Sequence, residues 1–302
     1  MEEVRLASGS IEVVVLPEAG ARLHRLRAFG HDLLPTPDDH AMHLRDPFSW
    51  GAYVMAPWCN RIDAEPVVVG PHRVELGPNF SDGSAIHGQV YDRPWQWSGD
   101  GTFTVEAGGD GWPWRYEVMQ QIEIGDRSLR LDYRLINRSP DPMPAGLGVH
   151  PWFVKPVLVA IRGDAVHPMN SGIQARAEPV AGPFDLRALA PMPPDLDATW
   201  TELGTPQVEL EWPAMGVGAT MRITAPTTYV VAASPANRDA VAVEPQTHAV
   251  RGLWRLLNGQ PGGLTVLGPE QELVLGIELA FERVAPSAPL SPIRSRRQAL
   301  RP

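Results

Sequence analysis

The sequence is almost free of cysteine and of lysine. Cys59 is the only cysteine in 302 residues, which excludes internal disulfides, cysteine-based zinc sites and iron–sulfur clusters. Lys155 is the only lysine, and because no Gly-Lys pair exists the chain has no P-loop. Schiff-base or pyridoxal chemistry would have to use Lys155 alone. Dinucleotide-binding, zinc-peptidase and serine-hydrolase motifs are missing as well, which excludes most familiar cofactor and hydrolase classes.

Basic charge and long apolar runs are also scarce. The chain has 26 Lys+Arg against 35 Asp+Glu, a formal net charge of −9, which argues against nucleic acid or an anionic membrane as a partner. No run of about 18 apolar residues is present to span a bilayer. The first residues, MEEVRLASGS, lack the basic and apolar stretches of a signal peptide. We therefore expect a cytoplasmic protein, as a monomer or a homodimer.

Proline and glycine, in contrast, are abundant. The 32 prolines and 28 glycines leave little room for long helices. Between them lie short runs such as Leu129–Leu135, which alternates apolar and polar residues as a strand with one buried face does. This density of strands predicts an all-β fold, a large antiparallel β-sandwich. Examples of the expected strands are Ile11–Leu16, Val67–Val69, Thr102–Glu106, Tyr116–Ile124, Leu129–Ile136, Val208–Leu210, Ala219–Ile223, Tyr229–Ala233 and Leu273–Phe281.

The strand pattern continues from about residue 4 to residue 284 without a linker, so we expect residues 1–284 to form a single domain. The end of the chain differs in composition. Residues Ala285–Pro302 hold four prolines and four arginines with no acidic residue and no aromatic residue. This composition predicts a disordered tail.

Polar side chains are embedded in four segments where a β-sandwich should bury apolar ones. They are Arg61 beside Trp58, His87 before a glycine, His150 between glycines and aromatic residues, and Glu244 at the end of an apolar strand. Each alone is explained equally well by a buried structural residue. The segments are Ala56–Ile62, Ile86–Gly88, Gly146–Phe153 and Val241–Thr247.

Together these residues form a set suited to acid–base chemistry on a sugar. A glutamate in apolar surroundings has a raised pKa, which suits a general base, and a histidine suits a general acid. Arginine, a second histidine and several tryptophans add hydrogen-bond donors and flat apolar surface. Such a surface packs against the C–H faces of a monosaccharide while its hydroxyls find polar partners.

His40 and His43 have a spacing found in metal sites, but no further ligand is obvious in their segment. We therefore expect a solvated loop and no metal there. His24, His31, His72 and His167 carry no signal, whereas His248 follows one of the four segments and is placed to border a site.

The order of these motifs resembles the aldose 1-epimerase, or mutarotase, family of the galactose-mutarotase-like superfamily. The resemblance spans about residues 10–282, and its specificity lies in the ordered set of sites. The matching pieces are Glu18–Leu26, Met55–Ile62 with Pro-Trp-Cys-Asn-Arg-Ile, Ile86-His-Gly88 followed by Pro94-Trp95, Met143–Phe153 with His-Pro-Trp-Phe, Leu196–Trp200 with Leu-Asp, Val243–His248 with Glu-Pro, and Leu267–Gln271.

The resemblance implies a supersandwich fold with the sugar site in its concave face. It implies that Glu244 is the general base and His150 the general acid of a reaction that interconverts the α and β anomers of a free aldose. It further implies that Arg61, His87 and Asp197 bind the substrate, with Asn60 adjoining them. No metal or redox cofactor is needed for that reaction.

Two departures from the family pattern leave alternatives open. Glu270 stands where the family has a glycine, and Ala198 stands where it has a second aspartate. The alternatives are a mutarotase for a phosphorylated or modified sugar, and a catalytically silent sugar-binding or sensor protein. A glycoside hydrolase would use Asp197 with Glu244 as its two carboxylates, but both histidines would then have no role.

Overall fold

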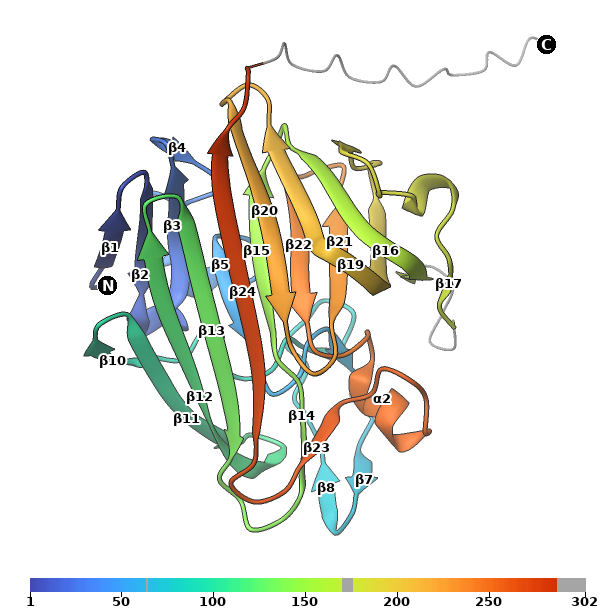
Figure 1. Ribbon diagram of the computed structural model, residues 1–302. Coiled ribbons are helices and arrows are strands. Elements are labelled where there is room, and N and C mark those ends of the chain that lie inside the picture. Colours follow the sequence, from blue (N-terminus) through green and yellow to red (C-terminus); the bar gives the residue numbers. More distant parts are fainter. Residues whose placement is uncertain (64, 170–175, 287–302) are drawn as a thin grey trace, which may run out of the picture.

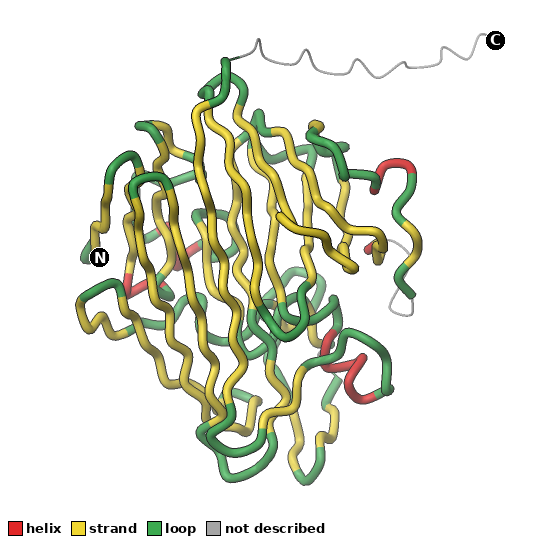
Figure 2. Tube along the Cα trace, viewed as in Figure 1, coloured by secondary structure: helices red, strands yellow, loops and turns green. Residues whose placement is uncertain are grey.

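The computed structural model describes residues 1–63, 65–169 and 176–286. Strands dominate the described chain (Figure 2), as the sequence predicts. Two short α-helices, α1 (Met42–Arg45) and α2 (Gly252–Leu257), and two 3-10 turns, Pro17–Ala19 and Gly182–Phe184, interrupt them. Within the described ranges, every helix is far too short to cross a bilayer. Of the expected carboxy-terminal tail, all but residues 285–286 lies outside the described residues.

One continuous antiparallel sheet folds over into two layers (Figure 1). In hydrogen-bonding order, the first layer contains β1 (Val4–Ser8), β2 (Ile11–Leu16), β3 (Arg22–Ala28), β5 (Ala52–Met55), β15 (Gly148–Val154), β22 (Ala240–Gln246) and β21 (Tyr229–Ser234), with β4 (His31–Asp32) also paired to β3. The second layer contains β10 (Gln96–Gly99), β11 (Thr102–Gly109), β12 (Trp112–Gly125), β13 (Ser128–Asn137), β24 (Glu272–Arg283) and β20 (Val217–Thr224).

Two long strands, β16 (Leu158–Pro168) and β19 (Leu196–Trp212), join the layers. The end of β19 pairs with β20 of the second layer, and its beginning pairs with β21 of the first. The register between β16 and β19 shifts between Ile161 and Gly163, where β19 uses extra residues that include Gly204 and Pro206. A glycine and a proline at this point favour a bend over a straight ladder.

Smaller ribbons lie outside the main sheet. They are β14 (Met143–Ala145) with β23 (Thr265–Leu267), β6 (Arg61–Ile62) with β9 (Ala85–Ile86), and β7 (Val67–Val69) with β8 (His72–Val74). The short strands β17 (Glu178–Pro179) and β18 (Ala190–Pro191) extend the sheet beside β16. Of these, the β6–β9 ribbon contains the predicted site residue Arg61, and Asn60 and His87 directly adjoin its two strands.

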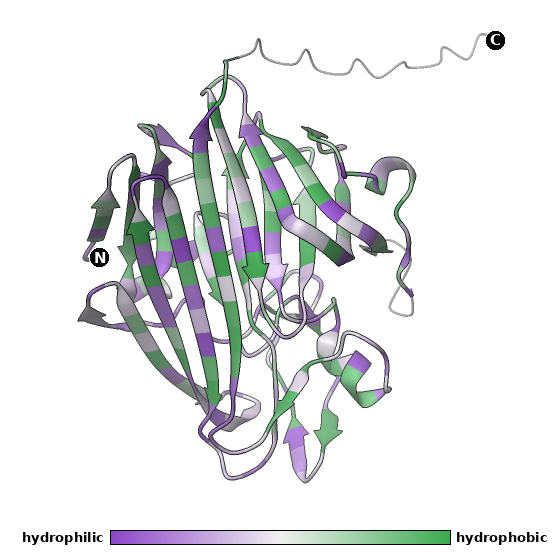
Figure 3. Cartoon of the chain, viewed as in Figure 1, coloured by the Kyte–Doolittle hydropathy of each residue, from purple (hydrophilic) through white to green (hydrophobic). Residues whose placement is uncertain are grey.

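The core lies between the two layers. In β13, Leu131 and Leu135 are buried while Arg130 and Arg134 are exposed, and the same alternation shows as stripes along β12, β13 and β24 in Figure 3. This period of two drives the layers together because each strand hides one apolar face from water. The predicted antiparallel β-sandwich is confirmed. That residues 1–284 form a single domain stays a prediction.

The first layer has a second face, turned away from the core, that holds the predicted site. Successive side chains on a strand point to opposite faces. In β15 and β22, Val149 and Val243 belong to the core between the layers. His150 and Glu244 therefore point to the opposite side, which we call the site face.

Candidate active site

The predicted general acid and general base lie next to each other in the middle of the site face. Strand β15 pairs with β22 in a register that matches Gly148 to Gln246 and Trp152 to Ala242, which places His150 opposite Glu244. Nε2 of His150 is 3.2 Å from Oε1 of Glu244. Two residues that are 94 positions apart in the chain are thus held together by the pairing of two strands.

Burial changes the acid–base properties of both side chains. His150 is 6% exposed and Glu244 is 3% exposed. Burial raises the pKa of Glu244 well above its usual value, and the charge of Asp197 acts in the same direction. Burial lowers the pKa of His150 to about 3. Because water solvates neither ion, the carboxylate is a strong base and the imidazolium a strong acid at this position.

Neighbouring rings hold the His150 imidazole in place. The Tyr53 ring stacks against it, with centroids 4.7 Å apart and planes inclined by 19°. His87 meets it edge-on at 5.3 Å, and Trp152 lies on another side at 4.9 Å. Tyr53 occupies this place because β5 pairs with β15 in a register that matches it to His150. The ring is therefore oriented mainly by packing.

Asn60 and His87 form a wall beside the His150–Glu244 pair. The backbone N–H of Asn60 donates to Nδ1 of His87 at 3.2 Å, and the backbone N–H of His87 donates to the carbonyl of Asn60 at 3.1 Å. Both residues have positive φ, 57° and 62°, a conformation that non-glycine residues rarely adopt. Since Nδ1 accepts a hydrogen bond, the neutral His87 ring carries its proton on Nε2.

The glycine after His87 makes this arrangement possible. A Cβ on Gly88 would lie 1.9 Å from the carbonyl oxygen of Ala56, so only glycine permits the close approach of the two segments. Burial also lowers the pKa of His87 well below its usual value, so the ring stays neutral at physiological pH.

Arg61 and Asp197 lie on the more open side of the site, and both are half-buried. Asp197 pairs with Ala233 of β21, which pairs with Ala242 of β22, so Asp197 shares the site face with Glu244. Burial raises the pKa of Asp197 to about 6, against the opposing charge of Arg61. Nε of Arg61 donates to Oδ2 of Asp82 at 2.6 Å.

The six predicted residues thus converge on one site. Asn60 contacts His87, which packs against His150; His150 contacts Glu244; and the charges of Asp197 and Arg61 both act on the Glu244 carboxyl. Their roles stay predictions.

Several residues of the site were not predicted from the sequence. Gln246 donates from Nε2 to Oε2 of Glu244 at 2.8 Å, and its position two residues further along the same strand was an available signal. Trp152 likewise lies two residues after His150 on the same strand, so its side chain points to the same face. The Arg238 guanidinium lies 4.3 Å from the centre of the Trp152 ring, and Tyr53 backs His150, but no sequence pattern marks either residue.

His248 supports the site from behind. Its Nε2 accepts the backbone N–H of Cys59 at 3.0 Å, and its Nδ1 donates to the carbonyl of Ala249 at 2.7 Å. A Cβ on Gly146 or on Gly252 would come within 2.3 Å or 2.5 Å of the ring, so the two glycines enclose it. His248 is 1% exposed and holds the segment that presents Asn60.

Comparison with solved structures places the chain among proteins of galactose-mutarotase-like fold. A galactose mutarotase-like protein of Clostridium acetobutylicum superposes with a TM-score of 0.80 at 17% identity, covering 93% of this chain and 95% of the other. Galactose 1-epimerase of Lactobacillus acidophilus superposes with a TM-score of 0.73 at 17% identity, covering 93% and 94%. These likenesses concern the fold.

Sequence comparison gives the family. The aldose 1-epimerase family model matches residues 2–255. An uncharacterized protein of Escherichia coli K12, YphB, is 25% identical over 254 residues, 76% of this chain and 83% of that protein. The chain belongs to the aldose 1-epimerase family, as its motifs indicate.

Proposed function

We propose that this protein interconverts the α and β anomers of a free aldose by opening and reclosing the sugar ring. The observation that carries the proposal is the buried contact between Glu244 and His150, 3.2 Å apart on the site face. In a cyclic aldose, the oxygen of the C1 hydroxyl and the ring oxygen are both bonded to C1. A base and an acid that are neighbours can therefore serve both oxygens of one hemiacetal.

In the proposed reaction Glu244 removes the proton from the C1 hydroxyl while His150 donates a proton to the ring oxygen. The bond between C1 and the ring oxygen breaks and the aldehyde forms. Rotation about the C1–C2 bond presents the other carbonyl face, and the reverse proton transfers close the ring. Each turnover returns both protons to where they began, so the enzyme needs no co-reactant.

Burial favours this proton exchange. Ring opening converts a carboxylate and an imidazolium into a neutral carboxylic acid and a neutral imidazole. The raised pKa of Glu244 and the lowered pKa of His150 both favour that neutral arrangement. The two arrangements hold the same number of protons, so the pair titrates as a unit. Hydroxyl groups of the sugar, together with Arg61, would stabilise the charged arrangement from which ring opening starts.

The remaining residues are suited to holding an uncharged sugar. Asp197 presents a carboxylate for hydroxyl groups, and the Nε2–H of His87 is a donor. Arg61 is paired with Asp82, and the Asp197 carboxylate brings further negative charge at neutral pH, which disfavours a phosphate group. These charges favour a free aldose over a phosphorylated one.

Anomer exchange measured by saturation-transfer NMR on a panel of aldoses and aldose phosphates tests the proposal. We expect the protein to accelerate exchange of at least one free aldose above the buffer rate, with calorimetry on the same sugars to report binding. Binding of sugars without acceleration would replace the enzyme with a sugar sensor. Acceleration confined to phosphorylated sugars would assign a different substrate class.

A further inference from the structure

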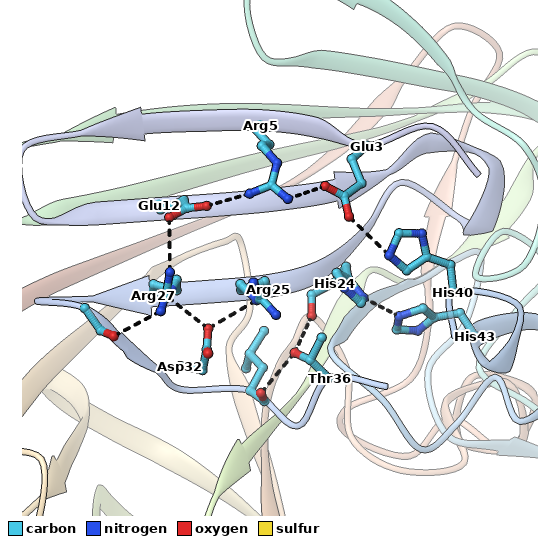
Figure 4. Close-up of polar contacts among 12 residues, drawn as sticks. Glu3, Arg5, Glu12, His24, Arg25, Arg27, Asp32, Thr36, His40 and His43 are labelled. Carbon is cyan, nitrogen blue, oxygen red and sulfur yellow. Dashed lines mark hydrogen bonds and ion pairs between the residues drawn. The ribbon is translucent and has the colours of Figure 1, made fainter. Parts of the chain in front are cut away.

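A second group of histidine and carboxylate side chains lies on the same sheet face, near the amino terminus (Figure 4). His24 of β3, His40 from the loop before α1, and Glu3 from the segment before β1 place one potential ligand atom each within 4.8 Å of one another. We call Glu3, His24, His40 and His43 the amino-terminal cluster. The sequence suggested His40 with His43, whereas the structure joins His40 to Glu3 and His24.

We propose that Glu3, His24 and His40 bind one divalent transition-metal ion of the zinc type. Two imidazoles and one carboxylate are a donor set that Zn²⁺ and Co²⁺ accept, and three protein ligands leave a position for water. Oε1 of Glu3 lies 3.2 Å from Nε2 of His40, and the His24 and His40 ring centroids are 4.6 Å apart. Ligands about 2.0–2.2 Å from zinc lie a little over 3 Å apart, so small side-chain rotations close the site.

The groups behind the ligands orient them, as second-shell partners do in metal sites. Nη2 of Arg5 donates to Oε2 of Glu3 at 2.5 Å, which leaves Oε1 directed at His40. Nη1 of Arg5 is in turn held by Glu12 at 3.1 Å. The carboxylate that would bind the metal is therefore fixed from the side opposite the ion, as Figure 4 shows.

His43 plays the same part for His24. Nδ1 of His24 is 2.8 Å from Nε2 of His43, and His43 is fully buried. If the proton is on Nδ1 of His24, that N–H donates to Nε2 of His43. The lone pair on Nε2 of His24 is then free to bind a metal. The other ring nitrogen of His43, Nδ1, lies 3.4 Å from Nη1 of Arg22. Nη1 already donates its two N–H groups to the carbonyls of Pro47 at 2.7 Å and Trp50 at 3.1 Å, so Nδ1 of His43 can carry the proton without the loss of a strong hydrogen bond.

The bound ion would tie together three segments that are separate in the chain. Glu3 precedes the edge strand β1, His24 belongs to the interior strand β3, and His40 belongs to the loop that leads into α1. A structural ion at this point stabilises the folded state by an amount that grows with the logarithm of the free ion concentration above its Kd, because the unfolded chain does not bring these ligands together.

The chain offers a matched control. Nε2 of His72 lies 3.2 Å from Oδ2 of Asp141, the same distance as in the His40–Glu3 pair, and both histidines are half-buried. His72 and Asp141 are not among the residues that form a three-ligand group in the described chain. If a histidine–carboxylate pair alone bound the ion, the two places would behave alike.

The test titrates Zn²⁺, and separately Co²⁺, into full-length protein freed of metal by a chelator and dialysis. We expect one Zn²⁺ per chain, visible absorption bands of Co²⁺ bound by nitrogen and oxygen ligands, and a melting temperature that rises with Zn²⁺. His40→Gln and Glu3→Gln, both at half-buried positions, should weaken binding about tenfold or more. His72→Gln should bind as the wild type does.

Two results would overturn the proposal. One is the absence of stoichiometric Zn²⁺ binding by the wild type. The other is unchanged affinity in both His40→Gln and Glu3→Gln, with circular dichroism showing that each variant is folded.

Discussion

Two groups of imidazole and carboxylate side chains lie on one face of one sheet, and they differ in burial and in what orients them. In the active-site group, Glu244 and His150 are almost inaccessible to water, and packed rings position the imidazole. In the amino-terminal cluster, Glu3 and His40 are half-buried and hydrogen-bonding partners position the ligands. Desolvation by packed side chains favours proton transfer between the two groups, whereas oriented lone pairs at an accessible place favour a metal ion.

The two groups are connected by contacts along the face. His43 of the amino-terminal cluster contacts Arg22, whose guanidinium lies 4.9 Å from the centre of the Tyr53 ring, and Tyr53 stacks on His150. Arg22 is fully buried, and burial lowers its pKa to about 10, so it stays charged at neutral pH. A fixed cation therefore separates the two groups and helps to keep His150 neutral.

The largest expected effect comes from removing the base. Glu244→Gln keeps the shape of the side chain and one acceptor oxygen, but the amide cannot take a proton from the C1 hydroxyl at neutral pH. Removal of a general base typically costs about 10²–10⁴ in rate. We expect a loss of that order in NMR anomer exchange with sugar binding retained in calorimetry. Glu272→Gln, at the exposed first residue of β24, is the control, and near-wild-type exchange in Glu244→Gln would show that the base is another residue.

Removing the proposed general acid, His150, tests whether the two residues of the active-site group act together. His150→Asn should lower exchange by a similar order, because the ring oxygen loses its proton donor. The double variant with Glu244→Gln should lose much less than the product of the two single effects, since both groups serve one ring-opening step. Anomer exchange of the four proteins, measured side by side, gives the coupling. Fully multiplicative losses would mean that the two residues act on separate steps.

Arg61→Lys tests the open side of the site and should have a smaller effect. The ammonium keeps the positive charge but cannot reproduce the planar fork that donates to Asp82 and that we propose also donates to substrate oxygens. We expect anomer exchange to fall by about tenfold, roughly the loss of one well-placed hydrogen bond. Arg162→Lys, at an exposed ion pair with Glu209, is the matched control. Equal activity of the two variants would remove Arg61 from the site.

Much of the fold is predictable from the sequence because alternation survives in the strands. The expected Ile11–Leu16 and Val67–Val69 coincide with β2 and β7. By contrast, only Val208–Leu210 was predicted for β19, which runs Leu196–Trp212. The bend between the layers interrupts the alternation of apolar and polar residues around Gly204 and Pro206. The sequence of this one strand therefore predicts separate short strands.

The site is predictable in its residue types and not in its geometry. The contact between His150 and Glu244 depends on the register of β15 and β22, which no local pattern encodes. His24 reads as an ordinary strand residue, and only the folded sheet brings it to Glu3 and His40. Glu270, which stands where a glycine was expected, adopts a φ of 56°, so the chain keeps the left-handed turn with a residue less suited to it.

Acidification should destabilise the protein through its buried neutral histidines. Burial lowers the pKa of His150 to about 3 and of His248 to about 4, and it holds the pKa of His87 well below its usual value. Between the unfolded value of 6.5 and about pH 4, the unfolded chain binds protons that the folded chain does not. Each such histidine makes the free energy of unfolding fall by about 1.4 kcal/mol per pH unit as the pH drops.

Buried carboxyls oppose this trend. The raised pKa values of Asp197, to about 6, and of Glu244 mean that the folded chain binds more protons than the unfolded chain below those values, which stabilises it at lower pH. Burial also lowers the pKa of His24 to about 4 and of His43 to about 2, and it raises the pKa of Asp92. In the described chain, five histidines with lowered pKa values thus outnumber three carboxyls with raised ones, so we expect a net loss of stability. Urea unfolding at pH 6.5 and pH 4.5 measures it, and equal free energies at the two values would contradict neutral buried histidines.

The smallest expected effect is that of a chelator on anomer exchange. The proposed chemistry uses only proton transfers between Glu244, His150 and the sugar, and none of these atoms is a ligand in the amino-terminal cluster. Removing a metal ion from Glu3, His24 and His40 should therefore lower the melting temperature while leaving anomer exchange at 25 °C within about twofold of the untreated rate, a change of less than about 0.5 kcal/mol. Exchange and thermal unfolding are measured on the same chelator-treated sample, with Zn²⁺ added back as the control. A loss of exchange that Zn²⁺ restores would show that the contacts through Arg22 and Tyr53 transmit the state of the cluster to His150. The proton-transfer site and the metal site would then be energetically coupled, and they would not be independent sites.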